Sequence, residues 1–186
     1  IIPCLDEADT LGTCLKKLKA VAKNNNIELE VIVADNGSDD GCPEIAEAHG
    51  ARVIRVAERG YGSALMAGIE AARGHLIIMG DAADSYDFLE IPGFVEALRS
   101  GHDLVQGCRL PAGGGRVMPG AMPFLHRWLG NPLLSRLARG RFGLPIGDIY
   151  CGMRGFTRAL YDRLDRDMQE TWAVHGVYPG LSWTCL

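Results

Sequence analysis

Hydrophobic and polar positions alternate along the chain in two periods, one typical of helices and one typical of strands. Residues 9–24 place leucine and valine at helical spacing on one face, which predicts an amphipathic helix. The runs 30–34 and 52–57 are short and rich in β-branched residues, as strands are. Residues 75–79 are mostly apolar and predict a third strand, and 103–106 predict a fourth. Between and after these strands, the helical period indicates helices at 43–49, 63–73 and 91–100.

This alternation predicts an α/β fold that is Rossmann-like, with a mainly parallel sheet covered by helices on both faces. A length of 186 residues suits one such domain. Polar clusters follow three of the strands, at residues 5–9, 35–40 and 81–87. In parallel sheets, ligands bind at the carboxyl ends of the strands. We therefore expect the three clusters to lie together on one edge of the sheet.

Composition excludes several classes of protein. The apolar share of 47% and the charged share of 23% are ordinary for a globular domain. A net charge of −4 gives no reason to expect a nucleic-acid partner. No apolar run reaches the roughly 18 residues of a membrane span, and the opening Ile1-Ile2-Pro3 resembles the end of a strand in a longer protein. The six cysteines form no CxxC pair, so we expect free thiols rather than a zinc site.

The second half of the chain carries an unusual excess of positive charge. Residues 104–147 contain no Asp or Glu but six arginines. Within them, 119–144 also contains many leucines and a tryptophan, as basic amphipathic helices at membrane surfaces do. A helix that packs on the core and leaves its basic face in solvent has the same pattern. Both interpretations stay open on the sequence alone.

The polar clusters suggest specific chemistry. Asp81 and Asp84 follow an apolar strand, where carboxylates can hold a divalent cation that neutralises a leaving diphosphate. The same loop could simply cap the next helix. Asp35 stands at the end of another strand, where it can accept hydrogen bonds from a base or ribose, and Gly37 allows a turn close to a ligand. A plain Asn-Gly turn is the alternative.

A dinucleotide-binding fingerprint is absent. Gly60-Tyr61-Gly62 opens a helix, but Leu65 stands where the third glycine of GxGxxG belongs. The chain also lacks a Walker A motif, an HExxH motif and a GxSxG elbow. The three clusters therefore favour binding of a nucleotide diphosphate and a metal ion over hydride transfer.

At these clusters the sequence resembles family 2 glycosyltransferases of the GT-A fold, in the branch of the dolichol-phosphate mannose and glucose synthases. Five ordered motifs carry the resemblance: residues 2–7, 31–38, 60–64, 79–88 and 148–156. The resemblance covers residues 1–167, which we expect to form the GT-A catalytic domain. Residues 168–186 do not match the family and are left unassigned as a divergent tail.

The resemblance implies a hexosyltransferase that moves a hexose from a nucleotide diphosphate sugar to a polyprenyl phosphate, with inversion and with Mg²⁺ or Mn²⁺. Its implied metal ligands are Asp81 and Asp84. The implied catalytic residues are Asp81, Asp148, Arg109 and Arg154. The implied donor-binding residues are Pro3, Leu5, Glu7, Asp35, Gly37, Ser38, Gly60, Tyr61, Gly62, Asp81 and Ala82.

The acceptor implied by the resemblance fits the arginine-rich region. A phosphate monoester is already anionic, so it needs positioning and charge neutralisation more than a general base. Guanidinium groups match phosphate oxygens, and the basic region suits an anionic membrane that holds the acceptor. We therefore expect peripheral contact with a membrane. The expected location is its cytoplasmic face, with the full-length protein anchored there and this part of it soluble or peripheral.

The sequence departs from the family pattern at one telling position. Ala83 stands where the family's DxD motif has its second aspartate, and Asp84 could replace that aspartate after a small shift of the loop. One alternative is therefore a nucleotide-sugar-binding domain with impaired catalysis. Another is a GT-A transferase with a soluble acceptor. A sugar-phosphate nucleotidyltransferase is disfavoured, because residues 3–7 lack a glycine-rich basic loop.

Overall fold

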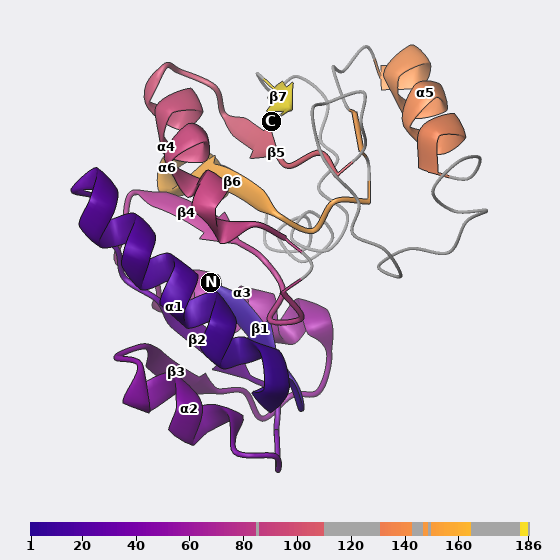
Figure 1. The fold of residues 1–186 in the computed structure, drawn as a ribbon. Helices are drawn as coiled ribbons and strands as arrows, with labels where there is room; N and C mark the ends of the chain where they lie inside the picture. The colour runs from indigo at the N-terminus through magenta and orange to yellow at the C-terminus, as the bar shows by residue number, and fades with distance from the viewer. Residues whose placement is uncertain (85, 110–130, 143–146, 149, 165–182, 186) are drawn as a thin grey trace.

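The structure is a computed structural model of residues 1–186, and it describes all of them except 85, 110–130, 143–146, 149, 165–182 and 186. Two sets of strands lie side by side, with helices on both faces (Figure 1). No helix in the described part is long and apolar enough to cross a membrane. Of the expected basic segment 119–144, only the helical portion 131–142 falls within the description. Of the tail 168–186, only 183–185 does.

The first set of strands is fully parallel. Neighbouring strands pair in the order β1 (Ile2–Cys4), β2 (Ile32–Asp35) and β3 (Arg52–Arg55). All residues of β1 and β2 are buried, as expected for strands covered on both faces. Cys4 pairs with Asp35 across β1 and β2, so the loops that leave these strands begin next to each other.

The second set is mixed, because one strand runs against its neighbours. The spatial order is β4 (Leu76–Met79), β6 (Arg154–Thr157), β5 (Leu104–Gln106) and β7 (Trp183–Cys185). Strand β6 is antiparallel to both β4 and β5, whereas β5 and β7 are parallel. This register places Arg154 opposite Met79 and Gln106, at the carboxyl ends of β4 and β5.

Two backbone hydrogen bonds join the sets. The amino nitrogen of Ile1 donates to the Ile78 carbonyl oxygen at 2.7 Å, and Gly80 N donates to the Ile1 carbonyl oxygen at 3.1 Å. One residue that bonds to both neighbours of its partner is the pattern of a parallel pair. Strand β4 therefore continues the sheet beyond β1, and the carboxyl ends of β1, β2 and β4 share one edge.

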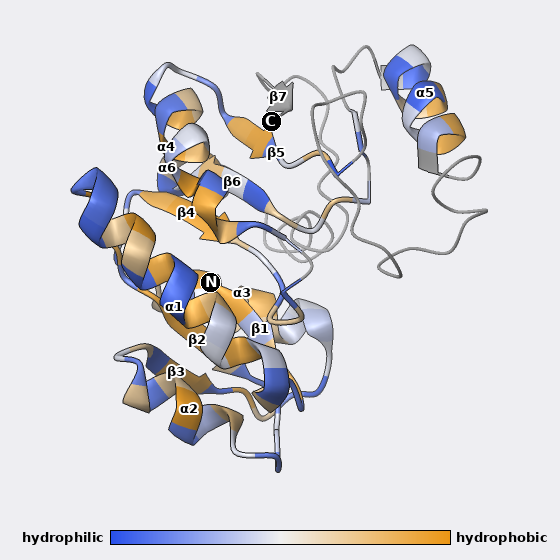
Figure 2. Cartoon of the chain, viewed as in Figure 1, coloured by the Kyte–Doolittle hydropathy of each residue, from blue (hydrophilic) through white to orange (hydrophobic). Residues whose placement is uncertain are grey.

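Helices cover both faces of this sheet and bury two cores. Helices α1, α2 and α4, with the short 3₁₀ helix η1, pack on one face, and α3 and α6 pack on the other. Figure 2 shows apolar strands between helices that expose polar residues. The described helices are α1 (Ala8–Asn25), α2 (Cys42–Ala48), α3 (Tyr61–Ala71), η1 (Phe88–Glu90), α4 (Ile91–Arg99), α5 (Asn131–Phe142) and α6 (Arg158–Tyr161).

The sequence predicted most of these elements. The four helices and four strands expected between residues 9 and 106 all form, with ends shifted by one or two residues in most cases. The mainly parallel sheet is confirmed except at β6, which was not predicted because Arg154-Gly-Phe-Thr157 has no apolar run. Five of the six cysteines are free thiols, as expected: Cys4, Cys14, Cys42, Cys108 and Cys151.

Candidate functional site

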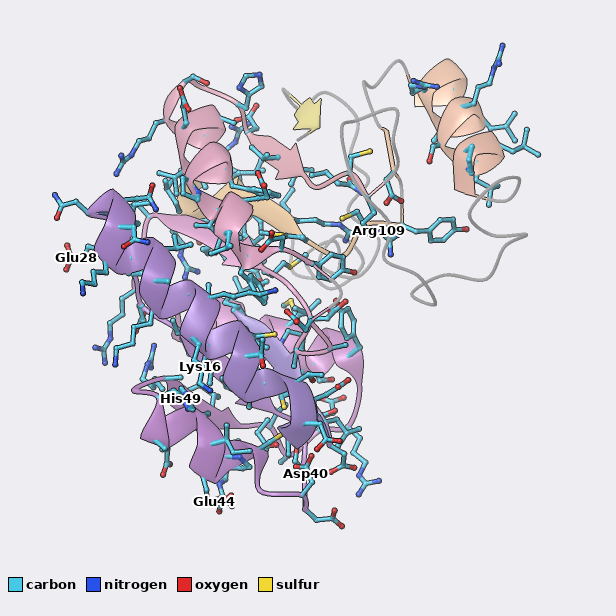
Figure 3. The ribbon with its side chains drawn as sticks, in the orientation of Figure 1. Lys16, Glu28, Asp40, Glu44, His49 and Arg109 are labelled. Carbon is cyan, nitrogen blue, oxygen red and sulfur yellow. The ribbon has the colours of Figure 1, made fainter. Side chains whose placement is uncertain are left out.

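The loops after β1 and β2 are bonded to each other at the carboxyl edge. Asp6 N donates to Ser38 Oγ at 3.1 Å, and Asp39 N donates to Asp6 Oδ1 at 3.1 Å. Asp40 Oδ2 accepts from Ala8 N at 2.7 Å, which places an acidic group at the amino end of α1. Figure 3 shows Asp40 beside this end of the helix. The first two polar clusters therefore form one surface, as expected.

Asp35 and its turn form the firmest part of that surface. The Asp35 side chain is buried, and its Oδ1 accepts from Ser38 N at 3.1 Å, so the carboxylate shapes its own turn. Gly37 has a φ of 96°, in the left-handed region that favours glycine. The turn also orients the second oxygen of the Asp35 carboxylate, which lies at the carboxyl end of β2.

Asn36 extends the site to a third loop, and sequence reasoning did not select it. Its Nδ2 donates to the carbonyl oxygens of Val56 and Glu58, at 3.3 and 2.8 Å, and its Oδ1 accepts from Gly60 N at 2.7 Å. The buried amide thus joins the turn after β2 to the start of α3. The only sequence signal was the Asn-Gly pair, which predicts a turn without revealing these distant partners.

The other residues expected to border the donor differ in exposure. Leu5 and Tyr61 are exposed, whereas Glu7, Ser38 and Gly62 are partly buried. Pro3 lies buried within β1, and Ala82 is buried with its carbonyl oxygen accepting from Cys14 Sγ at 3.3 Å. The side chains of Pro3 and Ala82 therefore pack inside the fold, and Leu5 and Tyr61 face outward beside the edge.

Two tyrosines hold the Asp81 carboxylate. Tyr61 Oη donates to Asp81 Oδ1 at 2.8 Å, and Tyr86 Oη donates to Asp81 Oδ2 at 3.0 Å. Burial, followed by the nearby Asp81 charge, raises the pKa of both phenols above its usual value, so both hydroxyls stay protonated as donors. Tyr86 was missed by sequence reasoning, because a tyrosine in a polar loop carries no spacing signal.

Gly152 brings the segment before β6 directly onto this carboxylate. Its backbone N donates to Tyr86 Oη at 3.0 Å. A Cβ at position 152 would lie 2.6 Å from Tyr86 Oη, closer than real Cβ atoms come, and 3.0 Å from Asp81 Oδ2, which is tighter than most Cβ contacts. Only glycine allows the two segments to approach this closely. Tyr86 therefore links the loop after β4 to the segment that leads into Arg154.

Arg109 and Asp148 form an ion pair next to this group. Asp148 is fully buried, and its two oxygens accept from Arg109 Nε at 2.8 Å and Arg109 Nη2 at 3.2 Å. Two backbone nitrogens, Arg109 N and Tyr150 N, also donate to the carboxylate. Burial alone would lower the pKa of Arg109, but the hydrogen bonds that it donates to Asp148 and the charge of that carboxylate give a net rise. Asp148 therefore holds the guanidinium in place.

The same guanidinium faces the Asp81 group. Arg109 Cζ lies 5.9 Å from the centre of the Tyr86 ring, within the range of a cation–π contact. Figure 3 shows Arg109 beyond the end of β5. A guanidinium has five N–H donors, and the Asp148 side chain uses two of them, so donors remain for a ligand.

Arg154 completes the positive charge at this edge. The residue is 5% exposed, and burial lowers the pKa of its guanidinium, while Tyr61, Cys151, Tyr86 and Asp81 act in the opposite direction. Three of these four side chains are Asp81 and the two tyrosines that bind it. The structure therefore brings together all four residues expected to be catalytic: Asp81, Arg109, Asp148 and Arg154.

The two expected metal ligands, Asp81 and Asp84, have different partners in the structure. Asp84 has a left-handed φ of 52° and pairs with Lys17 Nζ on α1 at 2.8 Å. Ala83, exposed between the two aspartates, has no ligand atom in its side chain. Among the described residues, no group of three His, Cys, Asp or Glu side chains could hold a metal ion. Mg²⁺ is usually bound by one or two carboxylates together with substrate phosphates and water. Here the Asp81 carboxylate already accepts from two tyrosines and Asp84 is paired with a lysine, so neither carboxylate fits such a site as it stands.

A cavity of about 690 Å³ lies at the opposite end of the strands. It is bordered by the residues that precede β2 and β4 and by apolar side chains such as Leu18, Ile27 and Val95. None of the expected donor or catalytic residues lines it. Ligands of open α/β sheets bind at carboxyl ends, so we assign the site to the polar edge.

Comparison with known proteins identifies relatives across nearly the whole chain. The family described as glycosyl transferase family 2 matches residues 1–165. The low-salt glycan biosynthesis hexosyltransferase Agl6 of Haloferax volcanii is 40% identical over 89% of this chain and 39% of its own length. A dolichyl-phosphate hexose transferase of the same organism is 34% identical, over 83% of this chain and 64% of its own length. The undecaprenyl-phosphate 4-deoxy-4-formamido-L-arabinose transferase of Klebsiella pneumoniae is 30% identical, over 88% of this chain and 50% of its own length.

Solved structures share the fold. Mannosyl-3-phosphoglycerate synthase from Rubrobacter xylanophilus superposes with a TM-score of 0.67 and 22% identity, over 86% of this chain and 52% of its own. Glucosyl-3-phosphoglycerate synthase from Mycobacterium tuberculosis, solved with Mn²⁺, uridine diphosphate and phosphoglyceric acid, gives a TM-score of 0.64 and 26% identity, over 88% and 56%. The expected GT-A fold is therefore confirmed.

The chain spans 39% to 64% of the length of the three curated relatives named above. The family match, by contrast, covers all but the last residues of the chain and includes the five motifs that carried the resemblance. The chain belongs to glycosyl transferase family 2.

Proposed function

We propose that this chain is the donor-binding and catalytic part of an inverting hexosyltransferase, with a nucleotide diphosphate sugar as donor and a polyprenyl phosphate as acceptor. The observation that carries the proposal is the shared edge where the Asp35 turn, the Asp81 carboxylate and two guanidinium groups meet. Relatives that act on dolichyl phosphate and undecaprenyl phosphate, at 34% and 30% identity, support the acceptor class. Residues 1–167 would be the catalytic domain, and the family match to residues 1–165 supports this boundary.

The two ends of the site suit the two ends of a nucleotide. The Asp35 carboxylate, fixed by Ser38 N, is placed to accept hydrogen bonds from the base or ribose. Gly37 leaves open space above the turn, since nothing lies within 4 Å of a Cβ built there. The diphosphate would then extend toward Asp81, whose carboxylate is fixed by the two tyrosines.

Charge, rather than a strong base, dominates the proposed chemistry. An oxygen of the acceptor phosphate attacks the anomeric carbon of the sugar from the side opposite the diphosphate. The new carbon–oxygen bond forms as the bond to the diphosphate breaks, the electron pair leaves with the nucleoside diphosphate, and the configuration inverts. Because the attacking oxygen is already anionic, no proton has to be removed. Arg109 and Arg154 would offset the repulsion between the two anions and stabilise the leaving group.

Helix α5 supports contact with a membrane that holds the acceptor. Three of its leucines are 42% to 59% exposed: Leu133, Leu134 and Leu137. Its arginines at 136, 139 and 141 are exposed as well, and its sequence contains no acidic residue. Figure 2 shows polar and apolar patches side by side on this helix. Apolar and basic groups on one exposed helix favour an anionic membrane surface, and we place the reaction on the cytoplasmic face.

A soluble phosphate is the second candidate acceptor. Solved relatives at 26% identity are synthases of glucosyl-3-phosphoglycerate, and their acceptor is also an anionic phosphate ester. The same two arginines would suit either acceptor, since both present phosphate oxygens. The exposed leucines of α5 favour the lipid.

Donor binding is tested by the melting temperature of the chain in the presence of UDP-glucose, GDP-mannose and UDP-N-acetylglucosamine. A ligand that binds only the folded state raises the melting temperature by mass action. One donor should raise it in the wild type and not in Asp35→Ala. Labelled transfer from that donor to dolichyl phosphate in anionic vesicles should exceed transfer to 3-phosphoglycerate. A chain that no donor stabilises would contradict the proposal, and faster transfer to 3-phosphoglycerate would replace the lipid by the soluble acceptor.

A further inference from the structure

We infer that donor binding by this chain does not depend on a divalent cation, because its own arginines neutralise the diphosphate that a cation would otherwise hold. The inference rests on the proposed function, since it concerns how that donor is bound. It goes beyond the relatives, one of which was solved with Mn²⁺ and uridine diphosphate.

The first argument is the supply of ligand atoms. Both oxygens of Asp81 already accept hydrogen bonds, from Tyr61 Oη at 2.8 Å and from Tyr86 Oη at 3.0 Å. The Asp84 carboxylate is paired with Lys17. The backbone of Asp84 has a left-handed φ, which fixes the direction of its side chain. A cation would have to displace a lysine or share an oxygen with a phenol. Mg²⁺ is usually held by one or two carboxylates beside the substrate phosphates, and neither Asp81 nor Asp84 is free to take that role without losing a partner.

The second argument is electrostatic. Arg154 is buried on β6 opposite Met79, which lies two residues before Asp81. Arg109 lies 5.9 Å from the centre of the Tyr86 ring, whose hydroxyl binds Asp81. Guanidinium groups at this edge of the sheet repel a cation, and at reduced dielectric that repulsion is strong. The same groups attract phosphate oxygens, and each can bind two of them at once. The positive charge that the diphosphate needs is therefore already built into β6 and the end of β5.

The third argument is the exposed methyl group of Ala83. A carboxylate at this position would supply a ligand atom and would also repel the incoming diphosphate. With alanine at this position, the carboxylate ligand is absent. The repulsion between that carboxylate and the diphosphate, which a cation would have to offset, is absent too. The described residues of the loop between β4 and η1 therefore offer fewer metal ligands, and they also leave less negative charge for a metal ion to neutralise.

Calorimetric titration of the chain with UDP and with GDP, in EDTA and again in Mn²⁺, tests the inference. The wild type should bind one nucleotide with the same affinity in both conditions. Ala83→Asp should bind that nucleotide more weakly in EDTA and recover affinity in Mn²⁺, by about tenfold or 1.4 kcal/mol. The electron paramagnetic resonance signal of free Mn²⁺ gives a direct second readout. The nucleotide-loaded wild type should leave that signal unchanged, and nucleotide-loaded Ala83→Asp should reduce it.

The control variant is Ala159→Asp, which adds the same charge at an exposed position on α6. It should behave as the wild type in both conditions, and melting curves check that every variant is folded. Nucleotide binding by the wild type only in Mn²⁺ would overturn the inference and leave the proposed function standing. Failure of the folded wild type to bind either nucleotide in both conditions would overturn the proposed function as well.

Discussion

Replacing Asp148 by asparagine should destabilise the fold more than any other single amide-for-carboxylate change at the site. Asparagine keeps the shape of the side chain but removes its charge. The buried carboxylate accepts two charge-assisted hydrogen bonds from Arg109 and two from backbone nitrogens. The amide group of asparagine cannot accept both bonds from the guanidinium, so Arg109 is left without its counterion.

The magnitude follows from the burial of the two partners. Removing one partner of a fully buried ion pair costs about 3–5 kcal/mol. The Arg109 side chain is 22% exposed, so water recovers part of the loss. We expect a decrease of about 2–4 kcal/mol in the free energy of unfolding, and about 2–4 °C in melting temperature for each kcal/mol in a domain of this size.

Urea unfolding followed by circular dichroism measures the effect. A double-mutant cycle with Arg109→Gln should give a coupling energy that accounts for most of it. Asp162→Asn, at an exposed position after α6, is the matched control and should change stability by less than about 0.5 kcal/mol. If Asp148→Asn costs as little as the control, or if the two changes are simply additive, Asp148 does not hold Arg109 in the way described.

Other changes test the remaining contacts of the site. Tyr86→Phe removes the bond to Asp81 and leaves Gly152 N without its partner, so unfolding free energy should fall by about 1–3 kcal/mol and donor affinity should fall with it; an unchanged donor affinity in calorimetry would contradict this. Gly152→Ala should cost about 1–3 kcal/mol through overcrowding, whereas Gly140→Ala on α5, where a Cβ meets nothing within 4 Å, should not destabilise; equal melting temperatures would refute the close approach. Asn36→Ala should weaken donor binding in thermal-shift titrations, because the start of α3 loses its tie to the Asp35 turn. Leu134→Asp should reduce co-sedimentation with anionic vesicles while leaving donor binding intact, and undiminished sedimentation would argue against α5 as the membrane contact.

The sequence predicted the parallel half of the fold well, because β1 and β2 are buried throughout and most of its strands are short apolar runs. Residues 75–79 and 30–34 differ sharply from the helices around them, and the polar clusters after them identified the edge. Strand β6 could not be found in this way. Its residues are a buried arginine, a glycine, a phenylalanine and a threonine, which form no apolar run. Its place in the sheet depends on pairing with β4 and β5.

The candidate site was predicted in its charged residues and missed in its connecting ones. Asp81, Arg109 and Arg154 were expected from the resemblance, and the structure places all three at the same edge of the sheet. Tyr86 and Asn36 were missed, because their role lies in hydrogen bonds to segments 5 to 66 residues away. The prediction of Asp84 as a metal ligand overlooked its ion pair with Lys17 on α1, because sequence spacing does not reveal that contact.

The central claim is that one nucleotide donor spans the Asp35 turn and the Asp81 group. Nuclear magnetic resonance titration with the nucleotide that stabilises the chain most tests this directly, with the backbone amides of Gly37 and Gly152 as reporters. We predict that both amides shift and that both give the same dissociation constant. Shifts confined to one of the two glycines, or two clearly different dissociation constants, would contradict the account.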